Sequence, residues 1–108
     1  MGNCQSILLA EIPDSNVTKC LQSGIIRWYF NNLMVAFQEK DFITFSKSFA
    51  RIDFEQNGWN TGEGGRFVVI NTPHQDIQFV FKEYEHQKLC LLFDKSRAEL
   101  EILHIKNN

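Results

Sequence analysis

Apolar residues recur every three or four positions through most of the first half of the chain. The first stripe is Val17, Cys20, Leu21, Ile25 and Trp28, and the second is Ile26, Tyr29, Phe30, Leu33, Ala36 and Phe37. This period is typical of a helix with one buried face. It predicts a long helix over 14–39, bent or broken near Gly24. The apolar run at 6–12, closed by Pro13, instead predicts a strand.

A second helical pattern follows between residues 41 and 52. Phe42, Phe45 and Phe49 share one stripe, and Asp41 stands where a side chain can cap the first turn. The pattern predicts an amphipathic helix whose three phenylalanines are buried together.

The second half of the chain alternates apolar and polar residues. This alternation, together with β-branched residues, predicts strands at 66–72, 77–85, 88–93 and 98–105, joined by short turns. Successive strands with short connections pair as an antiparallel meander. We therefore expect one α+β domain over 1–108, with N-terminal helices packed on one face of a four- to five-stranded, mainly antiparallel sheet.

Composition narrows the possible partners. The 108 residues include 11 basic and 13 acidic side chains without a basic cluster, so a nucleic-acid partner is not expected. The three cysteines, Cys4, Cys20 and Cys90, match no disulfide framework and no metal-ligand spacing. They predict free thiols, a cytoplasmic location and no cofactor.

Two short motifs bear on membrane attachment and on metal binding. The start Met1-Gly2-Asn3-Cys4-Gln5-Ser6 resembles the amino termini of dually acylated signalling proteins. The resemblance implies membrane attachment only if Gly2 and Cys4 are acylated, and otherwise no membrane partner is expected. Residues 53–58 look like the opening of a calcium loop, but the closing position falls on Gly64, so no metal site is predicted.

Catalytic chemistry is not indicated. His74, His86 and His104 lie far apart in the sequence. The aspartates stand where caps and turns usually place them. No nucleophile and base can be paired from the sequence, so no catalytic residue is predicted.

The segment 55–65 differs from the rest because it combines four glycines and two asparagines with Trp59. Such a loop presents an aromatic side chain among adaptable hydrogen-bonding groups. It predicts a partner-binding site formed by Asn57, Trp59, Asn60 and Thr61. The alternative is that Trp59 folds back and closes one end of the core.

Two functions remain open on the sequence alone. The first is a small protein-binding module, such as an inhibitor, an immunity protein or an adaptor, that acts by surface contact with another protein. The second comes from a resemblance: Tyr29-Phe30 and Asp41-Phe42 on helices, followed by strands, resemble nuclear-transport-factor-like cone folds. That resemblance implies a small-molecule or catalytic pocket between helices and sheet. The oligomeric state is left open.

Overall fold

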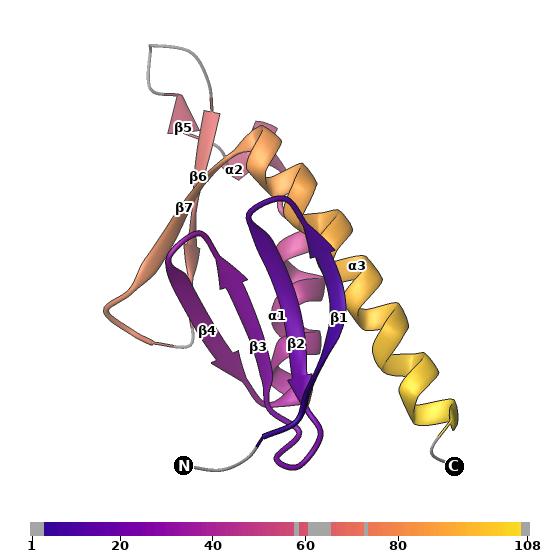
Figure 1. The fold of residues 1–108 in the computed structure, drawn as a ribbon. Coiled ribbons are helices and arrows are strands. Elements are labelled where there is room, and N and C mark those ends of the chain that lie inside the picture. Colours follow the sequence, from indigo (N-terminus) through magenta and orange to yellow (C-terminus); the bar gives the residue numbers. More distant parts are fainter. Residues whose placement is uncertain (1–3, 58, 61–65, 73, 107–108) are drawn as a thin grey trace.

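The computed structural model describes residues 4–57, 59–60, 66–72 and 74–106, and within them the chain forms two antiparallel sheets and three helices. In chain order the elements are β1 (Ser6–Ile12), β2 (Ser15–Cys20), β3 (Ile26–Phe30), β4 (Leu33–Phe37), α1 (Glu39–Ala50), α2 (Phe54–Asn57), β5 (Trp59–Asn60), β6 (Arg66–Asn71), β7 (Gln78–Lys82) and α3 (Glu83–Lys106) (Figure 1). The sheets have the strand orders β1-β2-β3-β4 and β5-β6-β7. The α+β class and the antiparallel pairing are confirmed. The strands form two sheets instead of one, however, and the helices follow the main sheet instead of preceding it.

Strands β2 to β4 replace the helix predicted over 14–39, which is wrong. The chain reverses at Pro13-Asp14 and at Asn31-Asn32, where Asp14 and Asn31 have φ angles of 68° and 54°. Asp and Asn enter this left-handed region more readily than most other side chains. Gly24, with a φ angle of 78°, lies in the turn between β2 and β3. These turns interrupt the backbone three times, so the apolar residues alternate across strands instead of lining one helix.

Trp28 is the centre of the core beneath the four-stranded sheet. Its side chain on β3 is only 1% exposed, and its ring packs edge-on against Phe79 and Phe93 at centroid distances of 5.3 and 5.0 Å. The indole Nε1 donates a hydrogen bond to Ser15 Oγ at 2.9 Å, and that hydroxyl donates to the carbonyl oxygen of Tyr29 at 2.7 Å. Trp28 therefore joins the four-stranded sheet to β7 and α3.

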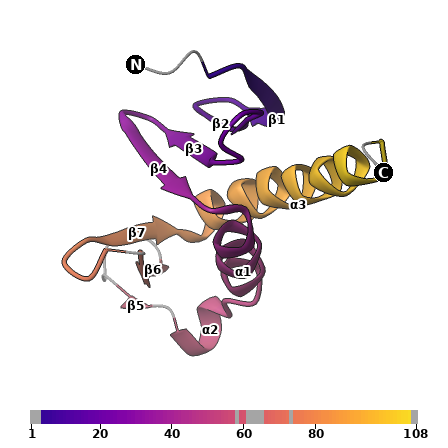
Figure 2. The ribbon, with the colours of Figure 1, turned by 90° about the horizontal axis from the view of Figure 1, so that it is seen from below.

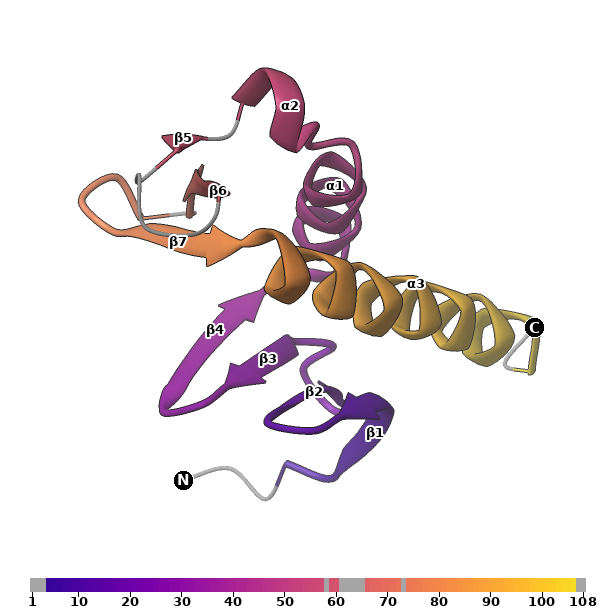
Figure 3. The same ribbon diagram turned by 90° about the horizontal axis from the view of Figure 1, so that it is seen from above.

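Helix α3 takes the place of the strands predicted at 88–93 and 98–105. Residues 83–106 contain no glycine or proline, and Leu89, Phe93 and Leu100 recur on the buried side. Leu91 and Ile105, on the opposite side, are 58% and 74% exposed. Apolar residues on two sides blur the helical period, and this is why short stretches alternate like strands. The helix lies between the four-stranded sheet and α1, as seen from above (Figure 3) and from below (Figure 2).

Helix α1 confirms the amphipathic helix predicted near residues 41–52. Phe42 and Phe49 are 0% and 1% exposed, and Phe45 is half-buried with its ring centroid 6.0 Å from that of Phe49. The helix begins earlier than expected, because Gln38 occupies the N-cap position without a side-chain hydrogen bond and Asp41 lies in the first turn. A negative charge there still interacts favourably with the helix dipole.

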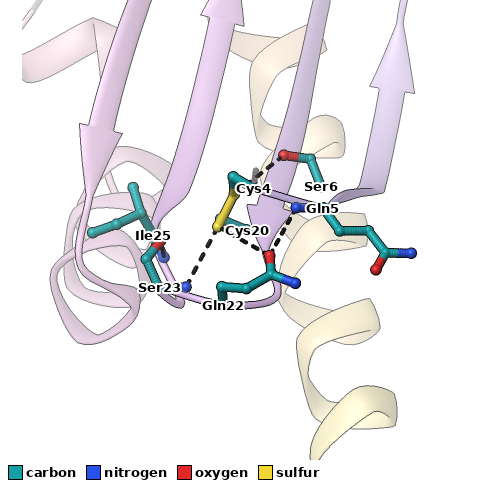
Figure 4. Close-up of a disulfide and its surroundings, with 7 residues drawn as sticks. All are labelled: Cys4, Gln5, Ser6, Cys20, Gln22, Ser23 and Ile25. Atoms are coloured by element: carbon teal, nitrogen blue, oxygen red, sulfur yellow. Dashed lines mark hydrogen bonds between the residues drawn. A yellow bond between two sulfur atoms is a disulfide. The ribbon is translucent and has the colours of Figure 1, made fainter. Parts of the chain in front are cut away.

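The prediction of three free thiols is wrong. Cys4 and Cys20 form a disulfide with their Cα atoms 5.7 Å apart, within the usual range (Figure 4). Two backbone contacts support the bridge: Gln5 N–H donates to Gln22 Oε1 at 2.7 Å, and Leu21 N–H donates to the Gln5 carbonyl at 2.9 Å. Cys90 is the free cysteine. The bridge ties the start of β1 to the end of β2, and the thiol count no longer supports a reducing compartment.

Candidate functional site

The described residues of the predicted contact site near position 59 are divided between a short helix and a short strand. Asn57 ends α2, and Trp59 and Asn60 form β5, in which they pair with Phe67 and Arg66 of β6. Thr61 lies outside the described residues. Trp59 and Asn60 thus belong to a small sheet, and not to the open loop that the sequence predicted.

Three ionisable side chains from distant segments meet near the end of β2 and the start of α1. Glu39 accepts a hydrogen bond from Lys19 Nζ at 3.0 Å through one carboxylate oxygen and from His104 Nε2 at 2.6 Å through the other. Burial alone would raise the pKa of the Glu39 carboxyl, but the hydrogen bonds and charges of His104 and Lys19 outweigh it and hold this pKa below its usual value. This cluster links β2, α1 and α3, and its carboxylate is already satisfied. We infer that this cluster holds β2, α1 and α3 together, and we call it the clasp.

A buried histidine and a cysteine lie together on α3, but they do not form a nucleophilic pair. His86 Nε2 donates to the Phe49 carbonyl at 2.6 Å, so this nitrogen carries a proton and caps the last turn of α1. Cys90 Sγ lies 3.5 Å from the same nitrogen. Burial, and then the charge of Asp94, raise the pKa of the Cys90 thiol. The other ring nitrogen, Nδ1, remains an acceptor and lies 3.8 Å from Sγ. A thiol whose pKa is raised nevertheless lacks the activation that nucleophilic catalysis needs.

The described residues contain neither a metal-binding cluster nor a membrane-spanning helix. Among the described residues, no three histidine, cysteine, aspartate or glutamate side chains gather closely enough to hold a metal ion. None of the helices in this part of the chain combines the length and apolar character needed to cross a membrane.

The two edges of the four-stranded sheet differ in how they are protected. Edge strand β1 carries Glu11, has a register shift between Leu8 and Ala10, and runs alongside α3 (Figure 1). Charges, bulges and covering elements are the usual means of preventing an edge from pairing with another chain. Edge strand β4 has the sequence LMVAF, with no charge and no proline, and its register with β3 is continuous. Leu33 and Met34 on this strand are 55% and 50% exposed. The β4 edge is therefore unprotected.

An apolar groove of about 330 Å³ runs along the β4 edge, and we call it the edge groove. Its lining residues are Leu33, Met34, Val35, Ala36, Thr72, His74, Ile77 and Phe79. One wall is β4 and the other is the β6–β7 turn with the first half of β7. The Thr72 hydroxyl donates to the carbonyl of Ile77 at 2.7 Å, which braces the turn. Ile77 is 55% exposed. A groove lined mainly by apolar side chains beside an open strand edge provides both backbone hydrogen-bonding groups and apolar contact area.

Other hollows combine these features less well. A cleft of about 220 Å³ lies where the turns at Asp14 and Asn31 approach the start of α3. Glu85, which lines this cleft, already accepts a hydrogen bond from the Lys82 backbone N–H at 2.9 Å through its carboxylate. A wider groove of about 550 Å³ separates α1 from β6, but only Val69 of its lining is a large, well-exposed apolar side chain.

The outer face of the four-stranded sheet adds one charge near the edge groove. Side chains alternate along a strand, so Arg27 and Tyr29 point away from the face on which Trp28 is buried. Arg27 pairs in register with Ala36 of β4. No described acidic side chain forms an ion pair with Arg27.

Comparison with known proteins gives one match. The sequence matches DUF6686, a family of unknown function, over residues 2–108. The chain belongs to this family. No curated protein and no solved structure matches it. Membership in this family therefore assigns no activity or partner to the chain.

Sequence reasoning missed the edge groove because its two walls are far apart in the chain. The spacing of apolar residues predicts a helix over 33–37, and the pattern at 72–79 predicts a turn followed by a strand. One signal was present. The run LMVAF follows two asparagines and contains no charge, which is unusual for a strand at the edge of a sheet.

Proposed function

We propose that this chain is a small protein-binding module that holds its partner at the edge groove. The observation that carries the proposal is the unprotected β4 edge, with Leu33 and Met34 half exposed beside an apolar groove. An exposed strand edge without charge, proline or bulge pairs readily with another chain, and soluble proteins keep such an edge where a partner covers it.

The filled core supports this function over a small-molecule pocket. The space between the helices and the four-stranded sheet is occupied by buried side chains, among them Trp28, Phe42 and Phe93. Tyr29 and Phe30 lie on a strand, so the element order behind the nuclear-transport-factor-like resemblance is absent. What remains on the surface is an open groove, and open apolar grooves suit extended polypeptides.

The segment around Trp59 is a second candidate contact. It pairs with the first residues of β6, whereas the edge groove borders the other end of the same strand. The two surfaces therefore lie at opposite ends of the β6–β7 hairpin, and one experiment can separate them.

Site-specific photo-crosslinking in the native host tests the proposal. A photoreactive amino acid is placed at Met34, at Trp59, or at Leu91 on the solvent side of α3 as a matched exposed control. We expect one protein to crosslink from position 34 but not from position 91, and the purified partner to bind the chain directly. Crosslinking from position 59 alone would favour the segment around Trp59, and crosslinking from position 91 alone would refute both surfaces.

A pair of variants then measures the contribution of the groove. Ile77→Asp puts a charge into the edge groove, and Val80→Asp puts the same charge on a comparably exposed position of β7 outside it; the two side chains are 55% and 59% exposed. We expect Ile77→Asp to weaken binding by about tenfold or more, equivalent to about 1.4 kcal/mol, because it desolvates a charge against apolar side chains. Equal effects of the two variants would contradict a binding site in the groove.

A further inference from the structure

We infer that the edge groove takes one extended peptide segment, which adds as a strand to β4 with aliphatic side chains toward the groove and an acidic side chain on the opposite face near Arg27. This inference rests on the proposed function and specifies its partner. It follows from the backbone of β4, the small volume of the groove and the position of Arg27 beside it.

The backbone of β4 calls for an extended partner. β4 pairs only with β3 among the described strands, so alternate residues direct their N–H and C=O groups away from the sheet. A strand laid beside it satisfies these groups, while a helix would leave them without partners. Since a two-residue turn joins β3 and β4 and the register holds from Leu33 to Phe37, this edge is regular along its whole length.

The second wall limits the occupant to a single chain. Ile77 and Phe79, which line the groove opposite β4, belong to the β6–β7 hairpin, and together with β4 they enclose only about 330 Å³. This volume lies at the lower end of the roughly 300–1,000 Å³ found for small-ligand pockets. A neighbouring strand needs about 4.8 Å beside β4, but the edge of another folded sheet would bring its own packed layers against the hairpin. A free peptide segment therefore fits better than a second copy of this chain.

Charges define the two faces of the added strand. His74 is the one ionisable side chain in the lining, so a charged side chain directed into the groove away from His74 would lose hydration without gaining a partner. Arg27 lies on the outer face of the sheet, one strand further in than Ala36, which also borders the groove. We expect the short side chain of Ala36 to let the guanidinium reach across β4. A carboxylate on the added strand, beside Ala36, would meet this guanidinium. The preferred segment therefore alternates aliphatic and polar residues and carries Asp or Glu at a polar position.

Selection from a random peptide library displayed on phage tests this preference, with the purified disulfide-bonded chain as bait. We expect enriched peptides to alternate Val, Ile or Leu with polar residues and to contain an acid at one polar position. Their affinity should fall by about tenfold or more with Ile77→Asp and remain near wild type with Val80→Asp. With Arg27→Glu as bait, the selected acid should change to Lys or Arg. Thermal melting of each variant checks that it is folded.

Amide hydrogen exchange identifies the binding mode. A bound peptide should slow exchange at alternate amides of β4, which side-chain contact alone would not do. Binding that depends on Ile77 but shows no alternation, no slowed β4 amides or an acid preference unaffected by Arg27→Glu would overturn this inference and leave the proposed function standing. A dimer of the chain that Ile77→Asp dissociates would also overturn it, because the occupant would then be a second copy. Absence of any Ile77-dependent binding, together with no crosslink from position 34, would overturn both.

Discussion

Replacing Ser15 by alanine removes the hydroxyl that accepts the hydrogen bond from the buried indole of Trp28. Ser15 is 4% exposed and Trp28 1%, so water cannot readily replace the lost acceptor. An unsatisfied buried N–H costs about 1–3 kcal/mol. We therefore expect Ser15→Ala, which removes a single hydroxyl group, to lower the free energy of unfolding by about 1–3 kcal/mol.

A double-mutant cycle separates the hydrogen bond from packing. Trp28→Phe removes the N–H together with part of the ring, and in that background Ser15→Ala no longer orphans a donor. The loss of the 2.7 Å hydrogen bond from Ser15 to the Tyr29 carbonyl occurs in both backgrounds and cancels. We expect a coupling free energy of about 1 kcal/mol between the two substitutions.

Urea unfolding followed by far-ultraviolet circular dichroism is the suitable assay, because Trp28→Phe alters indole fluorescence directly. The midpoint and slope of each curve give the four unfolding free energies. If Ser15→Ala costs the same in both backgrounds, within about 0.3 kcal/mol, the hydrogen bond makes no contribution and this account of the core is wrong.

Three further predictions concern the disulfide, the clasp and the free thiol. Reducing the Cys4–Cys20 bridge, or replacing both cysteines by serine, should lower the urea midpoint, with a loss of at most about 3 kcal/mol for a loop of this length; an unchanged midpoint under reductant would contradict this. The lowered pKa of Glu39 means that its stabilisation is complete above the unfolded-state pKa and is lost as the pH falls through the folded value. Glu39→Gln should therefore flatten the stability profile in the acid range, as should His104→Ala in part, and an unchanged acid limb would argue against the clasp. Cys90 should react with iodoacetamide more slowly at pH 8 in the native protein than in urea, because its pKa is raised by burial; equal rates, followed by mass spectrometry, would show that the thiol is accessible.

Where local chemistry is unambiguous, the fold follows from the sequence. β1 spans Ser6–Ile12 as predicted, because a short apolar run ends at a proline. β6 and α1 were also predicted near their observed positions, since β-branched residues and a spaced phenylalanine stripe each point to one period. In these segments local preference and tertiary packing agree.

Elsewhere two periods compete, and only packing decides between them. The residues of β3 and β4 satisfy a helical spacing as well as an alternating one, and the turn at Asn31-Asn32 selects the strands. In α3 the outer apolar residues, such as Leu91, hide the helical stripe. The edge groove was beyond prediction for a related reason: its walls come from segments that meet only once both sheets are assembled, so no local pattern reports it.

The packing of α3 against β1 joins the last described element to the first, and the two are far apart in the sequence. A ribosome releases β1 to β4 well before Glu83–Lys106, and the meander can pair as soon as it emerges, because its contacts are local. Its inner face is covered in two stages. Trp28 packs against Phe45 of α1 and Phe79 of β7, whereas the part formed by β1 and β2 packs against α3. Synthesis therefore leaves part of an apolar sheet exposed until Glu83–Lys106 has left the ribosome. Premature termination within α3 should yield a product that chaperones retain and proteases remove.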